Sequence, residues 1–204
     1  MNNEFAPTKA NLLKIKSSLE FCENGFELLD KKRNILIREL MSMVSDAEKV
    51  QKNIYTELEK GYKALQTVNL TMGINSVEEV AKSISKTENF NILYKSVMGV
   101  EIPIIDYKEI EFTPSYGFYR TNAAFDNVVM HFRKVKYLVY VYAQLETSIY
   151  KLAIEIRKTQ KRANALDNII IPKYKDGYKT IREFLEEKER EDFFRLKRVK
   201  SKVK

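Results

Sequence analysis

Residues that could carry out acid–base or metal chemistry are few in this sequence of 204 residues. His131 is the one histidine and Cys22 the one cysteine, and they stand far apart. A zinc or general-base site needs several such groups at short spacings, so we expect His131 to be a helix-flank residue. We expect Cys22 to behave as a small buried apolar side chain, and a lone cysteine permits no internal disulfide. The sequence therefore predicts no metal site and no catalytic site.

Phosphate-binding motifs are also missing. The sequence contains neither G-x-x-x-x-G-K-[ST] nor G-x-G-x-x-G, the two patterns that cradle nucleotide phosphates. The carboxylates from Glu183 to Asp192 alternate with Lys188 and Arg190, as on a solvated helix face. We therefore expect no cofactor, and no enzyme activity in the chain by itself.

The charge of the chain is concentrated at its C-terminus. The net charge is +8, from 36 Lys and Arg against 28 Asp and Glu, and the last ten residues, RLKRVKSKVK, carry six positive charges. Such a tail can bind nucleic acid or an anionic membrane, or it can solubilise a helix end or meet an acidic protein. We favour the last two readings, because no zinc motif, helix-turn-helix or RNA-stacking motif accompanies it. We find no signal peptide and no apolar run of 18 residues, so we expect a cytoplasmic protein without membrane insertion.

A heptad repeat organises the first third of the chain. Thr8 is the expected N-cap and Met72-Gly73 the expected end of one long helix, with Arg33 as the only polar interruption of its apolar stripe. A period of 3.5 residues indicates a helix that winds left-handedly around an equally long partner. The stripe consists of Leu12, Ile15, Leu19, Cys22, Phe26, Leu29, Leu36, Leu40, Met43, Ala47, Val50 and Ile54.

A small insert follows at 73–117. Ser76 and Glu79 have the spacing of a capping box, which predicts a short helix with Val77, Val80, Ala81 and Ile84 on its apolar face. The runs 90–97 and 100–105 are rich in residues that favour strands, and the two residues between them fit a hairpin turn. Residues 107–112 are expected to extend the pairing.

The last third, 118–204, repeats the helical period. The run KYLVYVYA could be a strand, but the helical spacing on both sides and the missing glycine and proline overrule that reading. Pro172 either kinks or breaks this helix; we favour a kink. The apolar stripe consists of Phe125, Val128, Phe132, Val135, Val139, Tyr142, Leu145, Ile149, Leu152, Ile156, Ala163, Leu166 and Ile170.

The simplest fold is therefore mainly α. It is a long, left-handed, antiparallel coiled coil of an N-terminal helix (1–72) and a C-terminal helix (118–204), with the short helix and β-hairpin of 73–117 inserted between them. If residue 72 lies near residue 120, Thr8 falls opposite Phe184, and Arg33 faces Thr159 within reach of Glu155. From the residues alone, a coiled-coil tether or adaptor and a binder of nucleic acid or membrane surfaces remain open as alternatives.

Several blocks of the sequence resemble the D subunit, the central-stalk rotor component of A-type and V-type rotary ATPases. They are the opening APTKANLLKIKSSLEFCENGFELLDKKRNILIREL, then VEIPIIDY, SYGFYRTNAAFD, RANALDNIIIPKYKDGYKTI and EREDFFRLKRVK. The blocks occur at both ends and in the middle, in the order of the family, and leave out only about residues 61–90. The heptads alone would be weak support; the block around Ile171-Pro172 and the EREDFFRLK tail are more specific.

The resemblance implies a rotor shaft inside a hexamer of alternating catalytic and regulatory subunits. The insert would lie toward the membrane ring and its socket subunit, with the small F subunit alongside, and ATP would be hydrolysed on the catalytic subunits. The protein would thus be cytoplasmic and peripheral to a membrane. Whether the complex pumps protons or sodium ions, and whether it makes or hydrolyses ATP, stays open.

Two sets of contact residues follow as hypotheses. Basic side chains are expected to meet acidic loops of the hexamer, namely Lys9, Arg33, Arg162, Arg190, Arg195, Lys197 and Arg198. Apolar and aromatic side chains of the insert are expected to meet the F subunit or the socket, namely Ile102, Ile104, Tyr107 and Tyr116.

Overall fold

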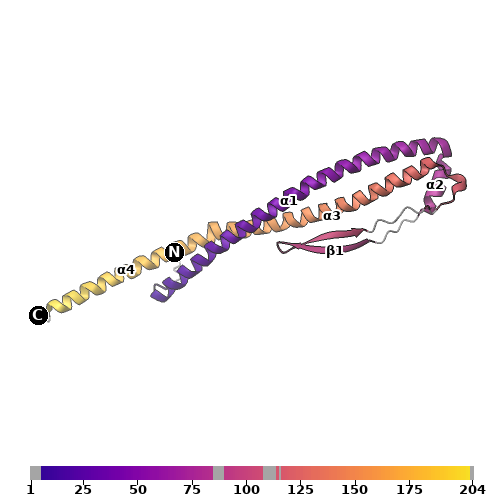
Figure 1. Cartoon of the computed structure of the whole chain (residues 1–204). Helices are drawn as coiled ribbons and strands as arrows, with labels where there is room; N and C mark the ends of the chain where they lie inside the picture. The colour runs from indigo at the N-terminus through magenta and orange to yellow at the C-terminus, as the bar shows by residue number, and fades with distance from the viewer. Residues whose placement is uncertain (1–5, 85–89, 108–113, 115, 203–204) are drawn as a thin grey trace. The chain divides into compact units, whose positions relative to one another are not determined.

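The computed structural model describes residues 6–84, 90–107, 114 and 116–202 (Figure 1). In chain order its elements are the helix α1 (Lys9–Met72), the short helix α2 (Ile74–Ser83), the strands β1 (Phe90–Val97) and β2 (Val100–Tyr107), and a 3₁₀ turn, η1 (Phe118–Arg120). The C-terminal helical segment then consists of α3 (Ala123–Ala165), a π-helical turn, η2 (Leu166–Ile170), and α4 (Ile171–Lys202). The predicted mainly α fold with an inserted hairpin is confirmed.

The ends of the first helix are set by local chemistry. The hydroxyl of Thr8 accepts a hydrogen bond from the Asn11 amide at 3.2 Å, as an N-cap does. After Met72, Gly73 has a φ of 80°, a left-handed conformation that glycine adopts without the cost of a Cβ. Both expected ends of this helix are confirmed.

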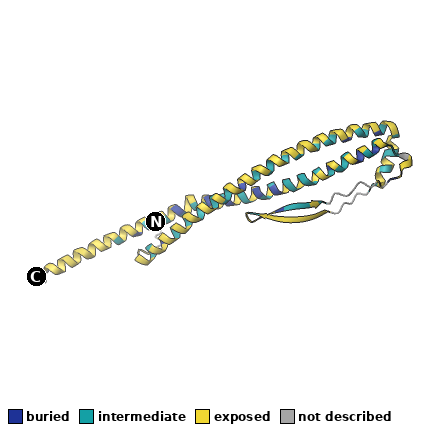
Figure 2. Ribbon diagram, viewed as in Figure 1, coloured by how far each residue is buried: buried dark blue, intermediate teal, exposed yellow. Residues whose placement is uncertain are grey.

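The chain divides into two compact units, residues 1–35 with 156–204 and residues 36–155. Each unit pairs a segment of α1 with a segment of the C-terminal helices, and the buried residues follow the facing sides of these helices (Figure 2). In the first unit the most buried side chains include Ile15, Ala163 and Ile181. In the second they include Leu36 and Leu152, which have no exposed surface.

The two heptad stripes are thus confirmed as packing surfaces, with two differences. Cys22, expected to be a small buried apolar side chain, is only half-buried. Val139 belongs to the predicted stripe and yet is 45% exposed. Small polar side chains take two of the buried places instead, Ser148 and Thr159, each 2% exposed.

The second unit has its apolar core where α1 ends. Val68 is completely buried there, together with Tyr116, Phe125 and Val128, and Val77, Val80 and Ile84 of the α2 segment pack against them. The predicted start of α2 is wrong: the helix begins at Ile74, its N-cap is Gly73, and no side chain caps it. The Val77 amide donates to the Gly73 carbonyl at 3.2 Å, so Ser76 lies inside the first turn, where it cannot act as the cap. Ala81 is exposed, not part of the packed face.

The β-hairpin is as predicted. β1 and β2 pair antiparallel over their whole length, from Phe90 opposite Tyr107 to Val97 opposite Val100. Met98 and Gly99 form the turn with φ values of 51° and 82°, the two positive values of a type I′ turn. The expected extension over 107–112 lies outside the described residues from position 108 onward.

Pro172 does not break the C-terminal helix. Helical backbone continues from Ala123 to Lys202, with the π-helical turn immediately before the proline. The Ile171 amide donates to the Leu166 carbonyl, five residues back, which is the bond of a π-turn. Proline has no N–H and its ring crowds the preceding turn, so a wider turn at this point relieves the helix. The run KYLVYVYA lies within α3, as predicted.

Candidate interaction sites

Metal-binding and membrane-spanning features were sought in the part of the chain that the structure describes. Within the described ranges, no group of three or more His, Cys, Asp or Glu residues is arranged to hold a metal ion. No helix of that part of the chain is both long and apolar enough to cross a membrane. The candidate functional residues of the sequence analysis are those that could contact other molecules, and the structure places them as follows.

Arg33 is held by one residue of its own helix α1 and by one residue of α3. One guanidinium nitrogen lies 2.5 Å from an Asp30 oxygen, and another donates a hydrogen bond to the Gln160 amide oxygen at 2.7 Å. Gln160 in turn donates to Asn164 at 2.6 Å. The prediction that Arg33 faces the Thr159 region is confirmed, whereas its contact with Glu155 stays a prediction.

Lys9 also binds across the same unit. Its ammonium group lies 2.7 Å from a Glu189 oxygen, and both side chains are largely exposed. The hydrogen bond to Glu189, together with the attraction of the two charges, raises the pKa of Lys9 above its ordinary value. The same bond lowers the pKa of Glu189. Lys175 and Glu23 make a second ion pair of this kind, at 2.9 Å.

The remaining basic candidates are exposed. Arg162 lies on the solvent side of α3. Arg190 pairs with Glu187 at 3.4 Å, and Arg195 lies 3.6 and 3.7 Å from oxygens of the two acidic residues that precede it at 191 and 192. No described carboxylate pairs with Lys197 or Arg198.

Large apolar side chains are exposed on the same stretch of α4. Their exposed fractions range from 59% to 69%, and they are Phe193, Phe194, Leu196 and Val199. The end of α4 therefore presents both basic and apolar groups.

The four candidates of the insert lie in two places. Ile102, Ile104 and Tyr107 belong to β2, while Tyr116 is part of the core beside Phe125. Ile102 and Tyr116 are only 5% and 7% exposed. Their contact with a partner stays a prediction, and the exposed large apolar residues of the two strands lie instead on β1.

Tyr116 is fixed by one strong hydrogen bond. Its hydroxyl donates to an Asp126 oxygen at 2.6 Å, and its ring meets Phe125 edge to face at 4.9 Å between centroids. Burial, together with the neighbouring Asp126 carboxylate, raises the pKa of Tyr116 far above its usual range. Tyr116 therefore stays a neutral donor that holds the insert to the start of α3.

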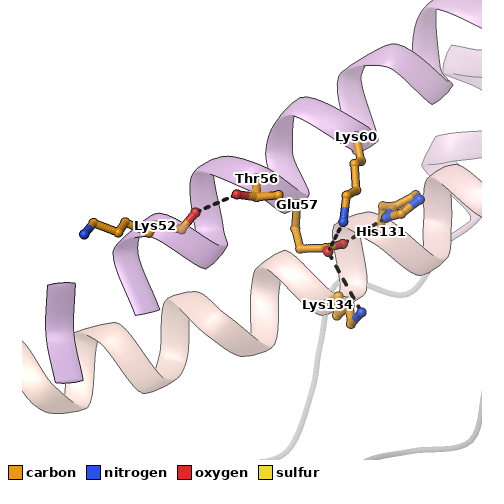
Figure 3. Close-up of polar contacts among 6 residues, drawn as sticks. All are labelled: Lys52, Thr56, Glu57, Lys60, His131 and Lys134. Carbon is orange, nitrogen blue, oxygen red and sulfur yellow. Dashed lines mark hydrogen bonds and ion pairs between the residues drawn. The ribbon is translucent and has the colours of Figure 1, made fainter. Parts of the chain in front are cut away.

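The sequence prediction missed a polar cluster that joins α1 to α3 in the second unit. Figure 3 shows Lys60 of α1, with His131 and Lys134 of α3, gathered around the Glu57 carboxylate, at 3.0, 3.1 and 4.0 Å. The Glu57 side chain is 12% exposed. The hydrogen bonds from Lys60 and from His131 lower the pKa of Glu57 below its ordinary value. His131 is thus a structural partner of a carboxylate.

The hairpin is fastened to α3 by a second set of contacts that sequence did not reveal. Gln144 accepts a hydrogen bond from the Ile105 amide at 2.9 Å, and Lys151 donates to the Glu101 carbonyl at 3.1 Å. The Lys151 ammonium also lies 5.3 Å from the centre of the Tyr94 ring. Tyr107 packs against two tyrosines of α3, at 5.4 and 5.8 Å between ring centroids.

Comparison with known proteins gives consistent matches along this chain. The family model for the D subunit of ATP synthase matches residues 11–201. The V-type ATP synthase D subunit of Thermotoga neapolitana is 44% identical over 198 residues, which cover 97% of this chain and 98% of that protein. The A-type ATP synthase D subunit of Pyrococcus furiosus is 34% identical over 198 residues, covering 96% and 92%. That of Methanopyrus kandleri is 33% identical over 199 residues, covering 97% and 86%.

Proposed function

The chain belongs to the family of the ATP synthase D subunit, and we propose that it is the central rotor shaft of a V/A-type ATPase. It transmits torque between a catalytic hexamer and a membrane ring, and itself catalyses no reaction. One observation carries this proposal: α1 is a single helix of 64 residues that pairs antiparallel with the C-terminal helices in both compact units. Interlocked buried side chains keep paired helices from sliding past each other, which is what torque transmission demands.

Such a shaft acts by making the otherwise equivalent catalytic interfaces of the hexamer differ from one another. Its two helices differ in sequence, so it presents a different set of side chains to each interface of the surrounding hexamer. A ligand or partner shifts a conformational equilibrium only through unequal contact with its states. The rotational angle of the shaft therefore biases which catalytic interface is open and which is closed.

The contacts proposed for the hexamer are the basic residues described above. On the exposed stretch of α4 they are Arg190, Arg195, Lys197 and Arg198, and Lys9, Arg33 and Arg162 lie on the rest of the first unit. Each exposed ion pair would contribute ~0–1 kcal/mol, which allows contacts to break and re-form during rotation.

The insert is proposed to face the other partners. Ile102, Ile104, Tyr107 and Tyr116 are assigned to the F subunit or to the socket component above the membrane ring. The protein is then cytoplasmic and peripheral to a membrane as part of the complex. Ion transport and ATP turnover belong to the other subunits.

Rotation is the property to test. The complex is purified through a tag on this chain, its subunits are identified, and its hexamer is fixed to a surface. Lys82→Cys, an exposed position of α2, in a Cys22→Ser background carries a bead. We expect ATP to drive rotation of the bead in one direction, and no net rotation without ATP. A bead that only diffuses while the complex hydrolyses ATP at its full rate would disprove the rotor role.

A further inference from the structure

The two edges of the β-hairpin differ in the contacts that the rest of the second unit makes with their backbone groups. On the outer edge of β2, the Ile105 amide donates to Gln144 and the Glu101 carbonyl accepts from Lys151. Between them stands Pro103, which has no N–H to offer. These features satisfy or remove hydrogen-bonding groups along β2, so its edge is protected against further pairing.

The register of the hairpin then fixes which groups of β1 point outward. In an antiparallel ladder, residues opposite each other alternate between pairs that bond to each other and pairs that direct their backbone groups away. Ile105 and Glu101 bond outward to α3, so their partners Ile92 and Ser96 also direct N–H and C=O outward, as does Tyr94 opposite Pro103.

Among the described residues, the outer edge of β1 has none of the protection found on β2. No described residue forms a hydrogen bond with the outward backbone groups of Ile92, Tyr94 or Ser96. β1 is eight residues long, contains no proline, and pairs without a bulge. Its apolar side chains are exposed as well: Ile92 by 50%, Leu93 by 55% and Tyr94 by 64%. Natural edge strands are usually shortened, charged, bulged or covered, and β1 carries only Lys95 as a charge.

We propose that the outer edge of β1 binds an extended, largely apolar segment of a neighbouring protein subunit, which adds a third strand to the hairpin. The outward N–H and C=O groups, which no described residue pairs, select an extended chain, because the backbone of a helix has its hydrogen bonds already made. The exposed apolar side chains of β1 select apolar side chains in the added strand. The inference goes beyond the rotor role. It rests on the proposed function only because the neighbouring subunit is taken to belong to the same ATPase complex.

Hydrogen exchange measures the pairing directly. Exchange at Ile92, Tyr94 and Ser96 is compared between the isolated chain and the ATPase complex purified through a tag on this chain. We expect these three amides to exchange at least about tenfold more slowly in the complex, because a strand bond must open before exchange. The backbone N–H groups of Leu93 and Lys95 point toward β2. These two amides serve as internal controls that are protected in both states.

A matched pair of variants separates backbone pairing from side-chain contact. Ile92→Pro removes the apolar side chain and the outward N–H, whereas Ile92→Ala removes the side chain alone. The proline should not disturb the hairpin, since Pro103 occupies an outward position on β2; continued protection of Leu93 and Lys95 checks this. We expect Ile92→Pro to abolish the slow exchange at Tyr94 in the complex and Ile92→Ala to keep most of it.

Three results would overturn the inference. The first is that the outward amides exchange equally fast in the isolated chain and in a complex that contains the hexamer subunits and rotates. This result would leave the rotor role intact. The second is equal loss in both variants, which assigns the contact to side chains. The third is protection of the isolated chain at high concentration with a doubled mass by light scattering, which identifies a second copy as the occupant. A chain that recovers no ATPase subunits would refute the rotor role and this assignment together.

Discussion

At the scale of single residues, the structure uses its ionisable groups to hold helices together. Glu57 is the clearest case: its carboxylate is nearly out of solvent and is satisfied by Lys60, His131 and Lys134. A carboxylate without such partners would be costly to bury. The cluster therefore fixes one point of α1 against one point of α3 in the second unit.

Glu57→Gln should lower the thermal stability of the chain at neutral pH and make it less sensitive to acid. The pKa of Glu57 is lowered in the folded state, so its stabilising effect is present above the unfolded pKa and is lost as pH falls through the folded pKa. The difference in melting temperature between wild type and variant should be largest near pH 7 and should vanish in strong acid. Melting curves from pH 7 to pH 2 measure it.

Glu59→Gln is the matched control. Glu59 also has a lowered pKa, owing to Lys63, but both side chains are about two-thirds exposed and lie on α1 alone. Its substitution should change stability less, because exposed ion pairs within one helix contribute little. Equal effects of the two substitutions at every pH would show that the contact between helices contributes nothing.

The sequence foretold some of these residue contacts and not others. The antiparallel register placed Arg33 near Thr159 correctly, because backbone spacing alone decides which turns of two helices meet. It did not identify the pairing of Glu57 with His131, since that choice depends on side-chain rotamers. Nor could periodicity tell which residues of β1 are exposed, because Ile92, Leu93 and Tyr94 are apolar on both faces of the strand.

At the scale of elements, a glycine marks close packing between α1 and α3. A methyl group placed on Gly61 would lie 3.6 Å from the Cβ of His131 and 3.6 Å from the Phe132 ring, which is ordinary contact. Tyr62 meets the same Phe132 ring edge to face, at 5.8 Å between centroids. There is thus space for one carbon atom and little more.

Two substitutions of Gly61 should therefore act in opposite directions. Gly61→Ala should stabilise the chain by about 0.5–1 kcal/mol, because alanine favours the helix interior and its Cβ fits. Gly61→Leu should destabilise it by about 1–3 kcal/mol, because the larger side chain must push the helices apart. Urea denaturation followed by circular dichroism measures both. A stabilising leucine would mean that the two helices are not in contact at Gly61.

Local patterns predicted most elements well. The long helices and the hairpin could be predicted because their signals each extend over only a few residues. These signals are the heptads, the Thr8 cap, Gly73 and the Met98-Gly99 turn. The start of α2 could not, because Gly73 opens the helix directly after α1 and leaves Ser76 inside it. The π-turn before Pro172 also escaped prediction, since it is a compromise between the proline ring and the packing of the turns around it.

At the scale of the whole molecule, the basic end of α4 is the part most suited to a surrounding partner. Among the described residues it joins unpaired cations to exposed aromatic and aliphatic side chains, a combination typical of protein interfaces. Each of its charges would contribute only weakly to binding the hexamer. We therefore expect a clear loss of binding only when several of them are changed together.

Reversal of four charges to glutamate should reveal this collective effect. The variant carries changes at Arg190, Arg195, Lys197 and Arg198, and we expect it to bind the hexamer at least about tenfold more weakly, from contacts of ~0–1 kcal/mol each. The loss should shrink at high salt, which screens exposed charges. Co-purification and ATP hydrolysis measure binding and coupling.

The control reverses four exposed lysines of the second unit, Lys49, Lys52, Lys63 and Lys82. It makes the same change in net charge, and we expect it to assemble normally. If both variants assembled and hydrolysed ATP like wild type, the basic residues of α4 would not be hexamer contacts.

The wide turn at Leu166–Ile170 gives the C-terminal segment a place where its length can vary. In a regular α-helix, successive side chains are rotated by about 100° around the helix axis. Inserting or deleting one residue elsewhere in α3 or α4 would therefore rotate all later side chains by that angle. A π-turn takes up one extra residue without that swing, and Ala163 and Ile171 on its two sides are both buried. A one-residue deletion here should thus be absorbed as ordinary winding. The angular setting of the basic end would survive a change that would misalign it anywhere else.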